Sequence, residues 1–427
     1  MIDRYRNEDI REIFSAQMRY DMWRQVEVDY IKARRVVFGD ESVTDEIRIE
    51  IEETPTPHAG TVEGRERKLG HDVMGFLDAW TEEMSNEAAS KIHYGLTSSD
   101  LVDNTLFQQM YFAGNTAWEL AEGLAHILQA MRHEHQITVR AGRTHGQKAE
   151  VTTWGWRCVV WYDSLQSLME EWHTSVAEQV NVIKTPGGVG NMQILGDHVP
   201  IVVAQVRGAT LAASTQVIPR QRMMAWAGWL LRLVSVCETI ALEVRLSSRS
   251  ETGEMLEGAA KDRVGSSAMP HKLNPIGSEQ ISGLARVARA YFASIAETAG
   301  VLHNERDISN SSVERIVVPD LAELTAYILQ STGNIVQNLQ LDPGRMFQNA
   351  MIPRSSLIQA RLQELGLPYM TANRMTRDWA ETGGWDYGEI IRELFEVGVE
   401  LKDAHAFHEA MGGTDFAVNL EPSKNWP

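Results

Sequence analysis

Residues 263–275 bring together side chains that can hold an anion or move a proton. The segment reads RVGSSAMPHKLNP. Two serines precede its first proline, and a histidine, a lysine and an asparagine lie between its two prolines. Proline is excluded from a helix interior, and no helical or strand period runs through the segment, which predicts a loop. Apolar helical stretches flank it on both sides, as is typical of a working site on a rigid scaffold. A connecting turn has the same breakers but seldom these polar side chains, and we favour a functional loop.

Two other polar segments could contribute to the same chemistry. Residues 93–100 read HYGLTSSD, and residues 142–150 read GRTHGQKAE. Histidine is the usual proton donor or acceptor near neutral pH, and His145 is the better placed of the two histidines. A surface histidine in a turn would give the same local sequence. The hydroxyl and acidic residues at 97–100, which end the HYGLTSSD segment, are good N-caps for the helix predicted to follow.

Two further polar clusters leave alternatives open. His71 followed by Asp72 is either an oriented acid–base histidine or a helix-cap pair, and we favour the cap. Residues 305–315 read ERDISNSSVER, with two arginines separated by hydroxyls. Guanidinium groups bind carboxylates or phosphates in a bidentate manner, although a solvated helix connection with ion pairs has the same pattern.

Metal and dinucleotide motifs have the wrong spacing. The HEH run at 133–135 places its histidines too close for one helix face to hold zinc. The GGVG run at 187–190 does not follow a strand in a strand–helix–strand unit, so a tight turn or lid is the better interpretation. We therefore expect neither a metal nor a cofactor.

Composition limits the class of protein. Of the 427 residues, 43% are hydrophobic, which is ordinary for a globular protein. The formal charge of −18 argues against general binding to nucleic acid or membrane surfaces. Cys158 and Cys237 lie in apolar runs, which predicts buried free thiols. The first residues are polar and lack a signal-type apolar core, so a cytoplasmic location is expected.

Helical periodicity dominates the chain and predicts a mainly α, all-helical fold in three parts. We expect an N-terminal domain of short helices at 1–95, a central long-helix bundle at 96–341 and a small C-terminal helical domain at 342–427. The long helices are expected at 101–131, 152–183, 221–246, 278–302 and 319–341, the last with Pro319 in its first turn. The 221–246 helix is apolar on more than one face and must be deeply buried in a bundle or oligomer. Strands are expected to be minor, with a possible hairpin in 185–200.

The polar segments resemble those of a known family. GSSAMPHKLNP at 265–275 resembles the signature of the fumarase/aspartase superfamily. The other segments resemble the adenylosuccinate lyase family in order and spacing: HDV at 71–73, HYGLTSSD at 93–100, GRTHG at 142–146, TQVIPR at 215–220 and ERDIS at 305–309. The match runs from Arg4 to about Arg315, with a looser helical match beyond.

The resemblance implies a function and an assembly. It implies cleavage of adenylosuccinate to AMP and fumarate, and of the succinylated aminoimidazole carboxamide nucleotide of purine synthesis. It further implies a homotetramer with each active site drawn from three subunits. This agrees with the strongly apolar 221–246 helix, which needs partners to bury its faces.

The resemblance also assigns roles to residues of this chain. The implied catalytic groups are the general base Ser266, the general acid His145, its orienting partner Glu279, and Lys272, with His71 lining the site. The groups implied to bind the succinyl carboxylates with Lys272 are Asn274, Thr97, Ser98 and Thr144. The other implied substrate-binding residues are Gln216, Asp72, His93 near the phosphate, and Arg4, Tyr5, Arg306, Ser311 and Arg315 for the nucleotide and its phosphate.

The chemistry is consistent with these roles. In β-elimination a base removes a proton beside a carboxylate while an acid protonates the departing nitrogen, and fixed donors stabilise the developing charge. Serine is an unusual base that needs a cationic neighbour such as Lys272 and backbone N–H groups. The residue types alone would suggest a histidine instead.

Some positions depart from the family pattern, and some rival functions remain. Gly70, His303, Asn304 and Asn310 replace the usual residues and leave room for an altered purine, such as a succinylated 2-amino-purine nucleotide. Argininosuccinate lyase is disfavoured because its substrate has no phosphate for the 305–315 arginines. Carboxymuconate cycloisomerases typically lack a histidine at the place of His145. Retention of the acid–base set disfavours a non-catalytic helical scaffold.

Overall fold

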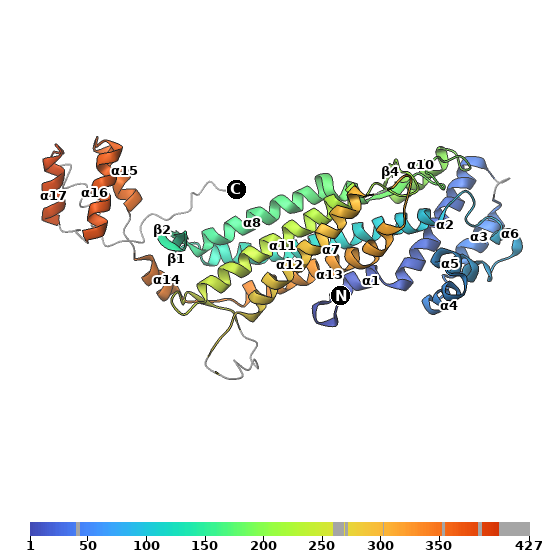
Figure 1. Cartoon of the computed structure of the whole chain (residues 1–427), viewed down its shortest axis with the longest axis horizontal. Coiled ribbons are helices and arrows are strands. Elements are labelled where there is room, and N and C mark those ends of the chain that lie inside the picture. The colour runs from blue at the N-terminus through green and yellow to red at the C-terminus, as the bar shows by residue number, and fades with distance from the viewer. Residues whose placement is uncertain are drawn as a thin grey trace. The chain divides into compact units, whose positions relative to one another are not determined.

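The computed structural model describes residues 1–39, 43–258, 269, 272–301, 303–351, 355–382 and 387–400, which form two compact units. The first unit comprises Met1–Ile127, Trp161–Arg245 and Ala259–Asn338, and the second comprises Leu128–Val160, Leu246–Gly258 and Leu339–Pro427. Helices make up most of the described chain, and its strands form three two-stranded sheets (Figure 1). The predicted mainly α, all-helical fold class is confirmed.

The first unit begins with helices that are capped by polar side chains. They are η1 (Asp3–Tyr5), α1 (Glu8–Ile13), α2 (Ala16–Phe38), α3 (Asp45–Glu53), α4 (Ala59–Leu69), α5 (Asp72–Thr81) and α6 (Asn86–Ala89). The N-caps of α1, α2, α3 and α6 are Asn7, Ser15, Thr44 and Ser85, each accepting a backbone N–H of the first turn. Most of these helices are short, as predicted, but α2 has 23 residues. The aromatic rings of Tyr20, Trp23, Phe76 and Trp80 pack at the centre of this region.

The predicted long helices are present with shifted ends. They are α7 (Ser98–Glu134), α8 (Trp154–Glu171), α11 (Gln221–Ser247), α12 (Ile276–Gly300) and α13 (Ser309–Gln337). A π-helical segment, η2 (Trp172–Val176), and a short α9 (Ala177–Val180) continue α8. The prediction that Pro319 lies in a first turn is wrong. Asp307 Oδ1 accepts the Ser309 N–H at 2.8 Å, so α13 starts ten residues earlier and contains Pro319 in its interior.

Helix α11 meets the expectation of deep burial. An 18-residue window in it has a mean hydropathy of 1.4, so by length and composition alone the helix could cross a membrane. Half of that window is buried in the protein, and Trp229 Nε1 donates to the Leu168 carbonyl oxygen at 2.8 Å. A core helix of a bundle has the same composition. Cys158 and Cys237 are buried free thiols, as predicted, and burial raises the pKa of each to about 12.

A glycine in α7 makes room for the start of the π-helical segment. A Cβ at Gly114 would lie 2.0 Å from the Trp172 ring, whose Nε1 donates to Asn115 Oδ1 at 3.0 Å. Gly114→Ala should therefore lower the free energy of unfolding by about 1–3 kcal/mol, because the ring must move out of a packed core. Gly123→Ala is the matched control on the same helix, where a Cβ meets nothing within 4 Å. It should be neutral or stabilising by up to about 1 kcal/mol. Equal thermal midpoints for the two variants would contradict this account.

The strands differ from the prediction in place. Strands β3 (Val182–Lys184) and β4 (Thr210–Ala212) pair in parallel in the first unit and enclose α10 (His198–Arg207). The suggested hairpin in 185–200 is wrong, because the backbone there forms turns around Gly187 and Gly190 and contains no strand. The tight turn expected for the GGVG run is present.

The second unit contains the hairpin. Strands β1 (Val139–Thr144) and β2 (Gln147–Thr153) pair antiparallel, and β5 (Met255–Leu256) pairs with β6 (Gln340–Leu341). Its helices are α14 (Pro343–Ala350), α15 (Ser355–Glu364), α16 (Tyr369–Thr382) and α17 (Tyr387–Glu396). Ile358, Leu362 and Trp379 belong to the small apolar core of the C-terminal helices. The segment predicted as a loop at 142–150 is therefore part of a β-hairpin.

Candidate active site

A buried carboxylate shapes the turn that begins α7. Asp100 Oδ2 accepts the Thr97 N–H at 2.6 Å and the Gly187 N–H at 3.1 Å. Its Oδ1 accepts from Lys184 Nζ at 2.5 Å, and both side chains of this ion pair are fully buried. Burial raises the pKa of Asp100 despite the opposing effect of Lys184. The ion pair thus fixes Thr97–Ser99 against the glycine-rich turn at 187–190.

Five of the predicted site residues meet at the start of α5, α7 and α13. His71 Nε2 lies 3.4 Å from Ser98 Oγ, and Arg315 forms an ion pair with Asp72 and donates to Ser311 Oγ at 3.2 Å. His71 also caps α5, since its Nδ1 accepts the Met74 N–H, so the favoured cap interpretation is confirmed. Burial raises the pKa of Asp72, but Arg315 outweighs it and holds that pKa below the ordinary value. The arrangement offers a cation, an imidazole and hydroxyls to one anionic group.

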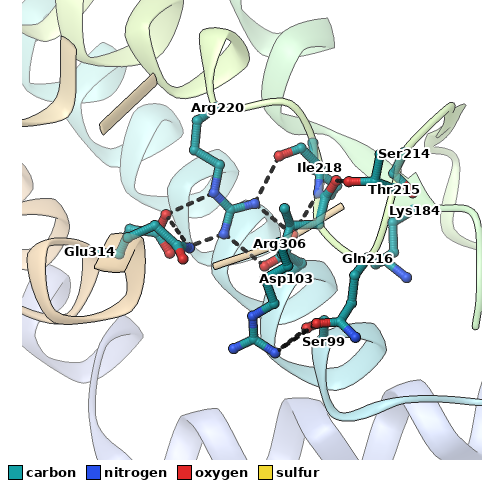
Figure 2. Close-up of polar contacts among 12 residues, drawn as sticks. Ser99, Asp103, Lys184, Ser214, Thr215, Gln216, Ile218, Arg220, Arg306 and Glu314 are labelled. Atoms are coloured by element: carbon teal, nitrogen blue, oxygen red, sulfur yellow. Dashed lines mark hydrogen bonds and ion pairs between the residues drawn. The ribbon is translucent and has the colours of Figure 1, made fainter. Parts of the chain in front are cut away.

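Arg306 contacts Ser99 and the predicted substrate-binding residue Gln216. Its Nη1 donates to Ser99 Oγ and to Gln216 Oε1, both at 3.0 Å (Figure 2). Gln216 Nε2 donates to the Gly188 carbonyl oxygen at 3.0 Å. Arg306 Nε is buried and has no hydrogen-bond partner in the described part of the chain. A buried donor without a partner is costly, and an oxyanion is its natural acceptor.

His93 is held by one carboxylate at two points. Glu27, 1% exposed, accepts the His93 backbone N–H at 2.9 Å and lies 2.7 Å from its Nδ1. His93 has a left-handed backbone (φ 57°), which directs both groups to Glu27. Burial lowers the pKa of His93, but the hydrogen bond and charge of Glu27, with the charge of Asp100, outweigh it and raise that pKa. The raised pKa favours the protonated ring, in which Nδ1–H donates to Glu27 and Nε2–H is a second donor.

His145 lies at the tip of the β1–β2 hairpin in the second unit. Thr144 pairs with Gln147 across a two-residue loop in which His145 (φ 53°) and Gly146 (φ 77°) are both left-handed, the pattern of a type I′ turn. The His145 side chain is exposed. The hairpin is anchored below the tip, because Arg143 donates to both oxygens of Glu254, which is fully buried and also accepts from Asn349.

The remaining predicted residues are placed as follows. Lys272 and Glu279 are exposed and Asn274 is half-buried, in and just before the first turn of α12. Tyr5 packs edge-on against Tyr327 of α13, and Arg4 beside it is exposed. Ser266 lies outside the described residues.

Known proteins have sequences similar to this one over most of its length. A lyase family model matches residues 15–289. The adenylosuccinate lyase of Bacillus subtilis (strain 168) is 34% identical over 351 residues, covering 82% of this chain and 80% of the relative. That of Streptococcus mutans is 34% identical over 421 residues, covering 94% and 92%. The chain belongs to the adenylosuccinate lyase family.

Solved structures agree with the family's fold. A fumarate lyase from Mesorhizobium sp. BNC1 superimposes with a TM-score of 0.75 at 19% identity, covering 98% of this chain and 95% of that one. A 3-carboxy-cis,cis-muconate lactonizing enzyme from Pseudomonas putida gives 0.77 at 20% identity, with coverage of 89% and 86%. At this identity the likeness concerns the fold alone.

Sequence reasoning missed three buried charges of this adenylosuccinate lyase family member: Glu27, Lys184 and Arg220. Glu27 was visible as a charge in apolar surroundings, since it lies between Val26 and Val28 in a helix, whereas Lys184 and Arg220 are each followed by a polar residue. A charge at such a position indicates a buried partner, because burying it alone is expensive. The sequence does not reveal which partner it has.

Proposed function

We propose that this protein catalyses β-elimination of fumarate from adenylosuccinate, giving AMP, and from the succinylated aminoimidazole carboxamide nucleotide. The observation that carries the proposal is the 34% identity to an adenylosuccinate lyase over 94% of this chain. The clustering of His71, Ser98, Arg306 and Arg315 in one unit supports it, since these groups suit the several anionic groups of such a substrate.

The proposed mechanism assigns each proton. Ser266 removes a proton from the succinyl carbon beside a carboxylate, the carbon–nitrogen bond breaks, and its electron pair passes to the departing nitrogen. His145 protonates that nitrogen, so the products are fumarate and AMP. Lys272 and Asn274, with Thr97, Ser98 and Thr144, hold the succinyl carboxylates as negative charge develops. Glu279 orients His145, while Gln216, His93, Arg4, Tyr5, Ser311 and the two arginines Arg306 and Arg315 bind the nucleotide.

The proposed assembly is a cytoplasmic homotetramer with shared active sites. Apolar side chains on the long helices remain partly exposed in one chain, among them Leu242, Leu246, Val287 and Ile316. His145 and Glu279 are likewise exposed and need neighbours to work in a water-poor site. Sedimentation of active enzyme as a monomer would contradict this assembly.

The decisive assay follows ultraviolet absorbance with three substrates in parallel: adenylosuccinate, argininosuccinate and a succinylated 2-amino-purine nucleotide. We expect turnover of adenylosuccinate without added metal or cofactor. Turnover of the 2-amino substrate alone would move the assignment to a modified purine. Among the positions that depart from the family pattern, Asn310 has a structural role, because it is buried and donates to Glu314 Oε1 at 2.9 Å. No turnover of any succinylated purine would overturn the proposal.

A further inference from the structure

Arg220, at the start of α11, is a buried charge in the first unit whose side chain makes five hydrogen bonds. Its side chain is 2% exposed, and its five N–H groups serve two carboxylates and one carbonyl. Nε and Nη2 donate to Glu314 at 2.7 and 3.0 Å, while Nη1 and Nη2 donate to Asp103 at 2.6 and 2.9 Å. Nη1 also donates to the Ile218 carbonyl oxygen at 2.8 Å. Figure 2 shows the guanidinium between the two carboxylates, with Gln216 and Arg306 on the Asp103 side.

Stability alone is a weak reason for such an arrangement. Removing one cation and two carboxylates from water is costly, and apolar residues of similar volume often replace buried ion pairs without loss. The planar guanidinium instead defines directions, since its donors lie in one plane with fixed angles. A bidentate contact to each carboxylate therefore sets both the separation and the rotation of the segments that carry them.

Three segments meet at Arg220, and each also carries predicted substrate contacts. Asp103 is one turn after Ser99 on α7, and Glu314 precedes Arg315 on α13. Ile218, whose N–H also donates to Asp103 at 2.7 Å, follows Gln216 by two residues. Gln216 and Ser99 both accept from Arg306 Nη1. A shift of any one segment would thus break the Arg306 contacts.

We propose that Arg220 is a positioning residue that holds Ser99, Gln216 and Arg315 in register and thereby aligns Arg306 for the substrate anion. It does not touch substrate itself, because it is enclosed by its own partners. This inference rests on the proposed function for its kinetic part, whereas its structural part does not depend on which substrate is used.

The test is Arg220→Lys. A lysine keeps the charge but offers three donors from one nitrogen, so it cannot make bidentate contacts to both carboxylates. We expect a folded protein in which kcat/KM for adenylosuccinate falls at least about tenfold, mostly through a higher KM, as expected when binding contacts are misaligned. In a Gln216→Ala background the same substitution should have a smaller effect, because the two changes act on one group of contacts.

Arg232→Lys is the matched control. Arg232 also lies on α11 and makes a bidentate contact to Glu171, with both distances 2.6 Å, but it is half exposed. Its replacement should leave kcat and KM as in the wild type, since exposed ion pairs contribute little. An Arg220→Lys enzyme with wild-type KM and a lower thermal midpoint would assign Arg220 to stability alone and overturn the proposal.

A crystal structure of the Arg220→Lys variant provides a readout that is independent of turnover. We expect the Arg306 contacts to Ser99 and Gln216 to be lost or lengthened beyond hydrogen-bonding distance. Unchanged contacts would overturn the proposal, whatever the substrate. A wild-type enzyme that fails to turn over adenylosuccinate would instead overturn the proposed function, so the two failures are distinguishable.

Discussion

His145→Asn should reduce kcat at least about hundredfold and leave the thermal midpoint close to that of the wild type. The loss is expected because asparagine cannot protonate the departing nitrogen of the substrate. The fold should be kept because His145 has φ 53° at the first position of a type I′ turn, where asparagine is among the favoured residues. Steady-state kinetics and a thermal melt of the same preparation check both parts.

The choice of asparagine separates chemistry from backbone strain. Alanine in the left-handed region costs roughly 1–2 kcal/mol, so His145→Ala would disturb the hairpin as well as remove the acid. His198→Asn is the matched control, since His198 is exposed at the first position of α10. It should leave kcat unchanged. A kcat within a few-fold of wild type in His145→Asn would remove His145 from the acid role.

The hairpin also illustrates what the sequence could and could not predict. The periodicity of apolar residues predicted the long helices well, since each buries a continuous stripe. The two strands around residue 145 were missed because the usual hairpin signal is Asn-Gly or Asp-Gly, and here the turn is His-Gly. The second signal of a hairpin, an alternation of apolar and polar residues along each strand, is also weak here. The strands read VRAGRT and QKAEVTT and contain several charged residues, such as Arg143 and Lys148.

The polar contacts of the candidate site were predictable as residue types but not as pairs. Sequence segments with hydroxyls, histidines and arginines were identified, and several of them meet in the structure. The sequence did not identify which residues pair with each other, since Asp72 and Arg315 are 243 positions apart and Arg220 and Asp103 are 117 apart. Local sequence rules extend over a few turns of helix, whereas these contacts depend on how the long helices pack.

Glu27→Gln should raise KM for adenylosuccinate about tenfold or more at the high end of the pH range, because a hydrogen bond to a charged group contributes roughly 1.5–3 kcal/mol and Glu27 favours the protonated form of His93. The amide of glutamine can donate to an unprotonated Nδ1, so the variant stabilises the neutral ring. Burial, which lowers the pKa of His93, is then unopposed by Glu27. The measurement is KM across pH 6 to 8.5 for both enzymes.

The sign of the pH dependence distinguishes this role from simple loss of packing. In the wild type the raised pKa of His93 keeps the cation to a higher pH, whereas in the variant the cation is lost earlier as pH rises. The ratio of variant to wild-type KM should therefore be smallest at low pH and increase with pH. Titration of the substrate phosphate affects both enzymes equally and cancels in the ratio. Glu134→Gln, which removes an exposed carboxylate 3.8 Å from His135, should give a flat ratio near one. If the ratio for Glu27→Gln were also independent of pH, Glu27 would act on the position of His93 and not on its charge.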